Sequence, residues 1–330
     1  MFFKDEEEYK KYLEKNKINK EIEGKSNFFN MSENGEVLLE SSKCCNSSLD
    51  ITNYTNCLGW ILLSDKKTMG LLKLPFGDIY RNLTKEQYET AIYNNILLPQ
   101  IARQFQNDSA IYYIAKRGKA RNKYDANRRY ILTLDFKEKD EELIYGEDIL
   151  ERMKYDINEL RIEHLLYAIE DYLIEIGVKN QDIENARKDF IKQTIYNRFV
   201  KQADENNHNW GILVNQKTKK TRMAPLYDLD CCCDIGPLKK HKRIDKEGGT
   251  TGFESIMRQF EGEEWFNKFI KETIIDFNIN KAIKDSKKET NIDIPENIQK
   301  IYKDFFGQRF YEFKTGYEKS KKKVQEDKER

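Results

Sequence analysis

The chain has 330 residues and a formal net charge of +1 at pH 7, with 38% hydrophobic and 35% charged residues. This length suits two lobes or domains, and the hydrophobic share is too large for a disordered chain. A general nucleic-acid binder would carry a basic excess that this chain lacks, and no apolar run approaches the roughly 20 residues that a membrane-spanning helix needs.

The cysteines argue for a reducing environment. They are Cys44, Cys45, Cys57, Cys231, Cys232 and Cys233. Adjacent cysteines without a C-x-x-C spacing are untypical of a disulfide framework, so we interpret them as free thiols. The N-terminal residues turn acidic at once instead of forming an apolar signal sequence. These features together predict a cytoplasmic protein.

The N-terminal half is rich in predicted strands. Residues 2–24 predict a charged helix, which "GKSNFFNMSENG" ends. The runs "EVLLES", "CLGWILLS" and "MGLLKLP" then predict three strands. Thr84 begins a predicted helix, "TKEQYETAIYNNILLPQIARQF", which Pro99 kinks or ends. The runs "SAIYYIAKR" and "RRYILTLDF" predict two further strands.

The C-terminal half is mostly helical. Apolar residues recur at helical spacing in "INELRIEHLLYAIEDYLIEIG" and "NQDIENARKDFIKQTIYNRFVKQ". The polar loop "KQADENNHNW" follows, and after it come two short predicted strands, "WGILVN" and "RMAPLYDLD". We therefore divide the chain into an N-terminal helical extension (1–34), a strand-rich lobe (35–140) and a helical lobe (141–330), with a ligand cleft between the lobes.

The polar loop and the strand pair carry oxygen ligands at a spacing that suits phosphoryl transfer. Asp204 and Asn209 share the loop, and Asp228 lies at the end of the second strand. A carboxylate can orient a hydroxyl nucleophile and accept its proton, while an amide oxygen and a second carboxylate can hold magnesium on the phosphates of ATP. The alternative is that a loop rich in Asp and Asn after a helix is only a cap and a turn.

The same chemistry needs a cation on the phosphates from the other lobe. Lys73 stands in the apolar run "GLLKLP", where a lysine has no packing role. We expect a carboxylate on the following helix to orient it. Glu89 is the candidate, and Glu86, one turn earlier, stays open. The alternative is that Lys73 lies on an edge strand and extends its amine into water.

Three segments resemble those of a known kinase family. "FVKQADENNHNWGILVN", "RMAPLYDLD" and "LLKLP" are similar to the catalytic loop, the metal-binding segment and the nucleotide-lysine strand of the HipA-like serine/threonine kinases of bacteria, most closely the compact stand-alone CtkA-type members. The resemblance implies an α+β, two-lobed protein-kinase-like fold with a strand-rich N-lobe and a helical C-lobe. It also implies ATP and Mg²⁺ as cofactors, with Asp204 as catalytic base, Asn209 and Asp228 as metal ligands, and Lys73 as the phosphate lysine.

The chain departs from the family pattern in two places. The family's loop has Gly before the catalytic Asp and His two residues after it, whereas this chain has Ala203 and Asn206, with His208 nearby as a replacement. The Gly-rich phosphate loop is also missing, and "SSKCCNSSLDITNYTN" stands in its place. Phosphatidylinositol kinases carry a similar arrangement, so a lipid or small-molecule kinase remains an alternative. A catalytically degenerate kinase-fold interaction module is another.

The predicted function is ATP- and Mg²⁺-dependent phosphorylation of serine or threonine hydroxyls on a protein. The resemblance also implies autophosphorylation, which we expect in the serine-rich loop at Ser41, Ser42, Ser47 and Ser48. The expected partners are a protein substrate and, as in a toxin–antitoxin pair, an antitoxin-like or other regulatory protein. No specific nucleic acid and no membrane are expected as partners.

Overall fold

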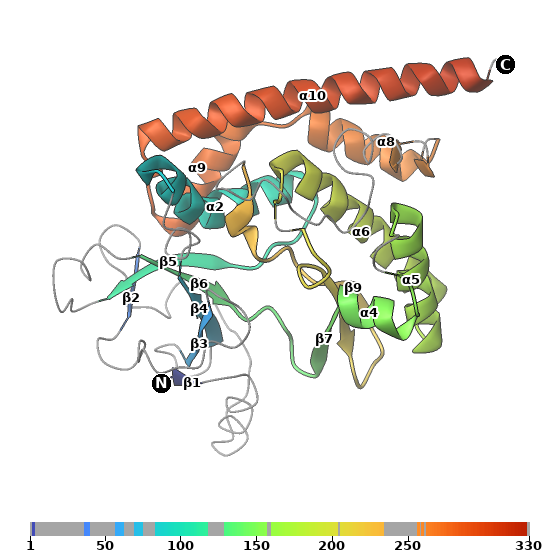
Figure 1. Ribbon diagram of the computed structural model, residues 1–330, viewed down its shortest axis with the longest axis horizontal. Coiled ribbons are helices and arrows are strands. Elements are labelled where there is room, and N and C mark those ends of the chain that lie inside the picture. The colour runs from blue at the N-terminus through green and yellow to red at the C-terminus, as the bar shows by residue number, and fades with distance from the viewer. Residues whose placement is uncertain are drawn as a thin grey trace.

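The computed structural model describes residues 2–3, 36–39, 57–62, 69–74, 83–117, 129–156, 160–203, 205–233, 256–257, 259–260 and 262–328 (Figure 1). Its elements in chain order are β1 (Phe2–Phe3), β2 (Val37–Leu39), β3 (Cys57–Leu62), β4 (Met69–Lys73), α2 (Lys85–Gln104), β5 (Tyr112–Arg117), β6 (Tyr130–Leu134), β7 (Glu141–Tyr145), α4 (Gly146–Arg152), α5 (Ile162–Glu175), α6 (Asn180–Val200), β8 (Gly211–Asn215), β9 (Thr221–Met223), the 3₁₀ turn η2 (Leu229–Cys231), α8 (Glu264–Ile270), the π-helical turn η3 (Lys271–Ile275), α9 (Ile279–Thr290) and α10 (Glu296–Lys328).

A six-stranded sheet with the order β1-β3-β4-β6-β5-β2 forms the N-lobe. Neighbouring strands pair antiparallel except for β2, which runs parallel to β5. Lys73 on β4 lies opposite Ile131 on β6. Tyr112 on β5 and Thr133 on β6 lie opposite each other two positions further along β6. Because side chains alternate between the faces of a strand, Lys73, Thr133 and Tyr112 share one face of the sheet.

Helix α2 lies between this sheet and the helices of the C-lobe (Figure 1). Thr84 Oγ1 accepts a hydrogen bond from the Gln87 N–H at 3.2 Å, and Gln87 Oε1 accepts one from the Thr84 N–H at 3.0 Å. This reciprocal capping box satisfies two backbone donors, so the helix begins where the sequence predicts. It does not end at Pro99 but continues to Gln104.

The C-lobe is built from helices around a small sheet. Helices α5 and α6 are joined by a tight turn in which Gly177 takes φ 79°, a left-handed conformation that glycine adopts without strain and that ends α5 as expected. Strands β7, β8 and β9 form a three-stranded antiparallel sheet. Helix α10 runs along one edge of the molecule past α9 and α8 (Figure 1).

A hydrophobic core cluster runs through both lobes and joins them. It includes buried residues of α2, β5 and β6 as well as of α5, α6 and α10. The ring of Phe199 on α6 lies 4.8 Å from that of Phe105, which caps α2, and 5.6 Å from that of Phe306 on α10. These aromatic contacts pack α2 and α10 against α6. None of the described helices is long and apolar enough to span a membrane.

The structure confirms the predicted strands β2 to β6 and the predicted helices α2, α5 and α6, and it corrects two expectations. A helix is predicted from residue 2, but Phe2–Phe3 form β1, because the free backbone groups at the edge of β3 pair with them. The rest of that predicted helix lies outside the described residues. The predicted strand pair is a three-stranded sheet, because Glu141–Tyr145 adds strand β7 beside β8. The side chains of β7 are half-buried or exposed, so their apolar pattern is weak.

Candidate active site

Lys73 and Asp228 meet where the N-lobe sheet faces the C-lobe. Lys73 is the last residue of β4, and Asp228 directly precedes η2. The Lys73 Nζ atom lies 2.7 Å from Asp228 Oδ1. The lysine side chain is 9% exposed and the aspartate side chain 28% exposed. The ion pair is therefore buried on the lysine side and open on the carboxylate side, where a ligand can reach it.

Contacts from both lobes hold the backbone around Asp228. The residue has φ 58° and ψ 53°, a left-handed conformation that Asp tolerates better than most residues. The Gln202 Nε2 atom donates to the Asp228 carbonyl oxygen at 2.7 Å. On the N-lobe side, the Ala110 N–H donates to the Leu226 carbonyl and the Leu226 N–H to the Asp108 carbonyl, each at 2.9 Å. These hydrogen bonds fix the backbone so that the Asp228 carboxylate points toward β4.

The predicted base, Asp204, lies outside the described residues, whereas both of its neighbours are placed. The Ala203 N–H donates to the carbonyl oxygen of Cys231 at 2.8 Å. On the other side, Glu205 forms an ion pair with Arg198 at 3.1 Å, and each of these side chains is only 5% exposed. The chain is thus anchored to η2 just before Asp204 and to α6 just after it.

Asn209, the predicted amide ligand, lies close to the segment that carries Asp228. The Asn209 N–H donates to the Asn206 carbonyl oxygen at 3.0 Å. The hydroxyl of Tyr227 donates to the His208 carbonyl oxygen at 2.6 Å. Asn206, Asn209 and Tyr227 line one small cavity. Because Tyr227 directly precedes Asp228, these contacts bring the two segments with the predicted metal ligands side by side.

A short helix that the sequence did not predict supports the loop. Helix α4 begins at Gly146, whose N–H donates to the Trp210 carbonyl at 3.0 Å, and the Glu147 N–H donates to the Asn207 carbonyl at 3.1 Å. A Cβ at Gly146 would lie 2.1 Å from the Trp210 indole, so a larger residue would force the loop away from α4. His208, the candidate replacement for the family's histidine, pairs with Glu147.

The predicted pairing of Lys73 with Glu89 is not formed. Within the part of the chain that the structure describes, Glu89 pairs with Lys85 on its own helix at 3.7 Å, and Glu86 is exposed. Lys73 pairs with Asp228 because the left-handed backbone of Asp228 projects its carboxylate across the lobe boundary to β4. The predicted Lys73–Glu89 pair is therefore corrected to Lys73–Asp228.

A second carboxylate, which sequence reasoning missed, is buried near this ion pair. Asp230 is 2% exposed, and a side-chain hydrogen bond with Asn95 on α2 acts on its carboxylate. Burial raises the pKa of Asp230 to about 6. The positive charge of Lys73 acts against this rise, and the negative charge of Asp228 adds to it. Burial also raises the pKa of Tyr112, whose ring is on the same sheet face as Lys73. The only signal for Asp230 was its place in "YDLD".

The oxygen ligands suit magnesium held with a nucleotide. In the described ranges, no three or more His, Cys, Asp or Glu side chains gather into a metal site. Magnesium usually takes one or two carboxylates and completes its shell with water and substrate phosphates, so it does not need such a cage. The carboxylate of Asp228 and the amide of Asn209 are donors of the kind that this mode requires.

The buried ion pair beside Asp204 leads to a stability prediction. Glu205→Ala is expected to lower the free energy of unfolding by about 3–5 kcal/mol, because it leaves the Arg198 guanidinium buried without this carboxylate. Denaturant unfolding measures the loss. The double variant Arg198→Met with Glu205→Leu is the control and should recover most of it. A loss below about 1 kcal/mol for Glu205→Ala would contradict this account of the ion pair.

Comparison with known proteins gives structural matches only. No protein-family model matches the sequence, and no curated protein matches it. The crystal structure of the Helicobacter pylori proinflammatory kinase CtkA matches with a TM-score of 0.59 at 13% sequence identity, over 86% of this chain and 98% of that chain. A chain from the complex of HipA, HipB and operator DNA of the Shewanella oneidensis MR-1 toxin–antitoxin system matches with a TM-score of 0.48 at 12% identity, over 74% of this chain and 58% of that chain.

The chain therefore has a two-lobed fold of the kind found in the kinase CtkA. The predicted α+β class, with a strand-rich N-lobe and a helical C-lobe, is confirmed. The resemblance to compact CtkA-type kinases that the sequence indicated is confirmed at the level of the fold. At 13% sequence identity, the match to CtkA shows similarity of fold and does not show similarity of function.

Proposed function

We propose that this chain transfers the γ-phosphoryl group of ATP, with magnesium, to a serine or threonine hydroxyl of a protein. The observation that supports the proposal most strongly is the 2.7 Å contact between Lys73 on β4 and Asp228 before η2. The contact joins the two lobes through a cation suited to phosphate oxygens and a carboxylate suited to magnesium. The kinase fold supplies the same arrangement of lobes around a nucleotide.

In the proposed reaction each residue has a distinct role. Asp204 accepts the proton of the substrate hydroxyl while the hydroxyl oxygen bonds to the γ-phosphorus, and the bond to the bridging oxygen of ADP breaks. Asp228 and Asn209 would hold the magnesium ion through their side-chain oxygens. When bound, this ion neutralises charge on the phosphate oxygens. Lys73 donates to those oxygens and stabilises the charge that develops on them in the transition state.

The proposed acceptor is a protein side chain because the catalytic-loop and metal-segment motifs resemble those of protein kinases. An antitoxin-like or other regulatory partner, and autophosphorylation at Ser41, Ser42, Ser47 and Ser48, belong to the same proposal. These serines lie outside the described residues.

The test is a transfer assay with a chemical readout of the acceptor. The pure protein is incubated with γ-³²P-labelled ATP and magnesium, with and without cell extract, and the labelled residues are mapped by mass spectrometry. Label on serine or threonine that disappears when magnesium is chelated is the expected result. Label confined to lipids or small metabolites would favour the second kind of kinase. No label together with no magnesium-dependent ATP binding would favour a degenerate interaction module.

A further inference from the structure

The half-buried side chain of Gln202 joins the start of the predicted catalytic loop to the segment that carries Asp228. Its Nε2 atom donates to the Asp228 carbonyl oxygen at 2.7 Å, and its Oε1 atom accepts from the Cys232 thiol at 3.2 Å. A backbone carbonyl can only accept, so the NH₂ end of the amide must face Asp228, which leaves the amide oxygen for the thiol. Gln202 therefore contacts the residues directly before and directly after η2.

Two backbone hydrogen bonds fix the position of Gln202 against η2. The Ala203 N–H donates to the Cys231 carbonyl oxygen and the Cys233 N–H to the Val200 carbonyl oxygen, each at 2.8 Å. Val200 and Ala203 lie on either side of Gln202 in the chain, so the backbone at Gln202 is already ordered. Its side chain can then hold the left-handed backbone of Asp228 at the entropic cost of one glutamine side chain.

The turn η2 is also held from the side of helix α2. The Asn94 Nδ2 atom on α2 donates to the Asp230 carbonyl at 3.4 Å and to the Cys232 carbonyl at 3.3 Å. Asn94 is fully buried, and the Tyr302 hydroxyl on α10 donates to Asn94 Oδ1 at 2.9 Å. The part of the segment beyond Asp228 is thus tied to α2 and, through it, to α10.

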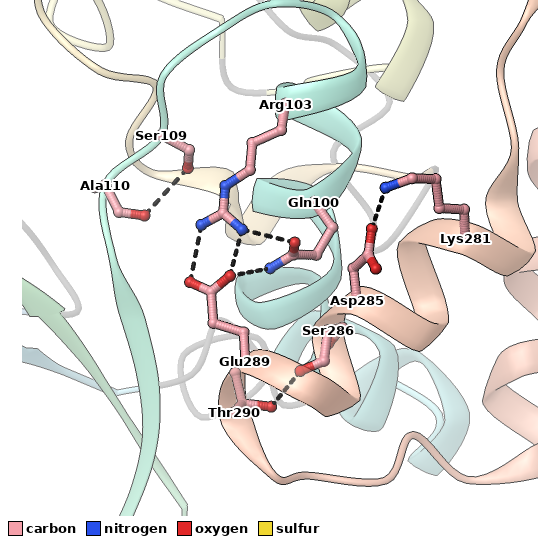
Figure 2. A network of polar contacts seen from close by, with 9 residues as sticks. All are labelled: Gln100, Arg103, Ser109, Ala110, Lys281, Asp285, Ser286, Glu289 and Thr290. Atoms are coloured by element: carbon pink, nitrogen blue, oxygen red, sulfur yellow. Dashed lines mark hydrogen bonds and ion pairs between the residues drawn. The ribbon is translucent and has the colours of Figure 1, made fainter. Parts of the chain in front are cut away.

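Helix α2 is in turn fixed to α9. Glu289 on α9 accepts from Arg103 Nη2 at 2.8 Å and from Gln100 Nε2 at 2.9 Å (Figure 2). Arg103 Nη1 also donates to Gln100 Oε1 at 2.7 Å. These contacts anchor η2 from the side of α2, and Gln202 anchors it from the side of the catalytic loop.

We propose that Gln202 is a positioning residue that keeps Asp228 in register with the catalytic loop, so that the metal ligand Asp228 and the base Asp204 address the same phosphoryl group. The inference rests on the proposed kinase function. In this structure the Asp228 carboxylate pairs with Lys73. To hold magnesium, this carboxylate must turn from the lysine while the backbone of Asp228 stays in place. The hydrogen bond from Gln202 to the Asp228 carbonyl keeps that backbone in place.

The magnesium dependence of phosphoryl transfer tests this role. Gln202→Met keeps the length of the side chain but removes both hydrogen bonds, and it should raise the magnesium concentration for half-maximal transfer about 10- to 100-fold. Gln193→Met is the matched control, because Gln193 Nε2 on α6 also donates at 2.7 Å to a backbone carbonyl between β9 and η2, that of Ala224. It should change this magnesium concentration by less than about twofold. No shift with Gln202→Met, or an equal shift with Gln193→Met, would overturn the proposal.

A second variant separates the two hydrogen bonds of Gln202. At a pH where its carboxyl is ionised, Gln202→Glu keeps an acceptor for the Cys232 thiol but turns an oxygen instead of a donor toward the Asp228 carbonyl. It should reproduce the shift in magnesium dependence, and it serves as the test variant if Gln202→Met does not fold. Wild-type magnesium dependence in Gln202→Glu would show that the bond to Asp228 has no positioning role.

Hydrogen–deuterium exchange of the nucleotide-free protein distinguishes this inference from the proposed function. Gln202→Met should speed exchange of the Ala203 and Cys233 amides about fivefold or more relative to the middle of α6, because the two segments part more often. Gln193→Met should leave this ratio unchanged within about twofold. Faster exchange in a protein whose wild type transfers no phosphate would reject the kinase activity and leave the link between the segments standing. Unchanged exchange with Gln202→Met would overturn the link.

Discussion

Replacing Asp228 by alanine is expected to lower phosphoryl transfer on the order of 10³-fold and to weaken magnesium-dependent ATP binding. Its carboxylate is the more exposed half of the ion pair with Lys73 and would be a charged oxygen ligand of the metal.

Asp204→Ala is expected to lower transfer by about 10²–10⁴-fold but to weaken ATP binding much less, because a general base acts on the acceptor hydroxyl. Transfer rates and calorimetric titrations with ATP, with and without magnesium, measure both effects.

The change at Asp228 needs a matched control for stability. Asp228→Ala leaves the buried Lys73 ammonium without this carboxylate, which costs stability apart from any chemistry. Asp228→Asn keeps the size of the side chain and one oxygen ligand, and thermal unfolding shows whether it is folded. Wild-type turnover in both Asp204→Ala and folded Asp228→Asn would show that the catalytic assignment is wrong.

The second large loss is expected for Lys73→Ala, which should lower phosphoryl transfer by about 10²–10³-fold because a preorganised cation is removed from the developing charge. Lys73 is 7% exposed and follows the fully buried Leu72 on β4, so packing alone gives no reason for a cation there. The rate at saturating ATP and the KM for ATP, measured on the same preparations, report the loss. Normal ATP binding and turnover by Lys73→Ala would mean that β4 is not the nucleotide strand.

Glu89→Ala and Glu86→Ala are the companion variants for Lys73. Glu89 pairs with Lys85, and Glu86 is exposed, so both changes should have small effects on transfer, with Glu86→Ala the smaller. A loss with Glu89→Ala as large as with Lys73→Ala would show that Glu89 orients the lysine after all.

Most of the fold could be predicted from local patterns. The apolar runs of β3 and β4 and the capping box of Thr84 are local signals, because alternation and caps depend on residues a few positions apart. Strand β7 gave no such signal, because it is half-buried and pairs only through β8. Helix α4 had one, the acidic Glu147 and Asp148 in its first turn, which favour a helix N-terminus.

The candidate residues were predictable as residue types, but their partners were not. Lys73 in an apolar strand and Asp228 at a strand end are unusual enough in the sequence to indicate a site. Asp230 looks like an ordinary polar residue after Asp228, and Gly146 looks like an ordinary turn glycine. Their importance comes from burial in η2 and from the approach of the Trp210 ring, and both depend on segments distant in the sequence.

The sequence by itself determined the two-lobed class and the candidate set of Lys73, Asp204, Asn209 and Asp228, because helix and strand periods and loop chemistry are local properties. Only the tertiary structure decided which carboxylate meets the lysine. Lys73 and Asp228 are 155 positions apart, and an ion pair depends on distance and burial in space. The left-handed turn at Asp228 and the contacts that hold α2 to α9 and α10 set that distance, and neither has a signature in the residues around Lys73.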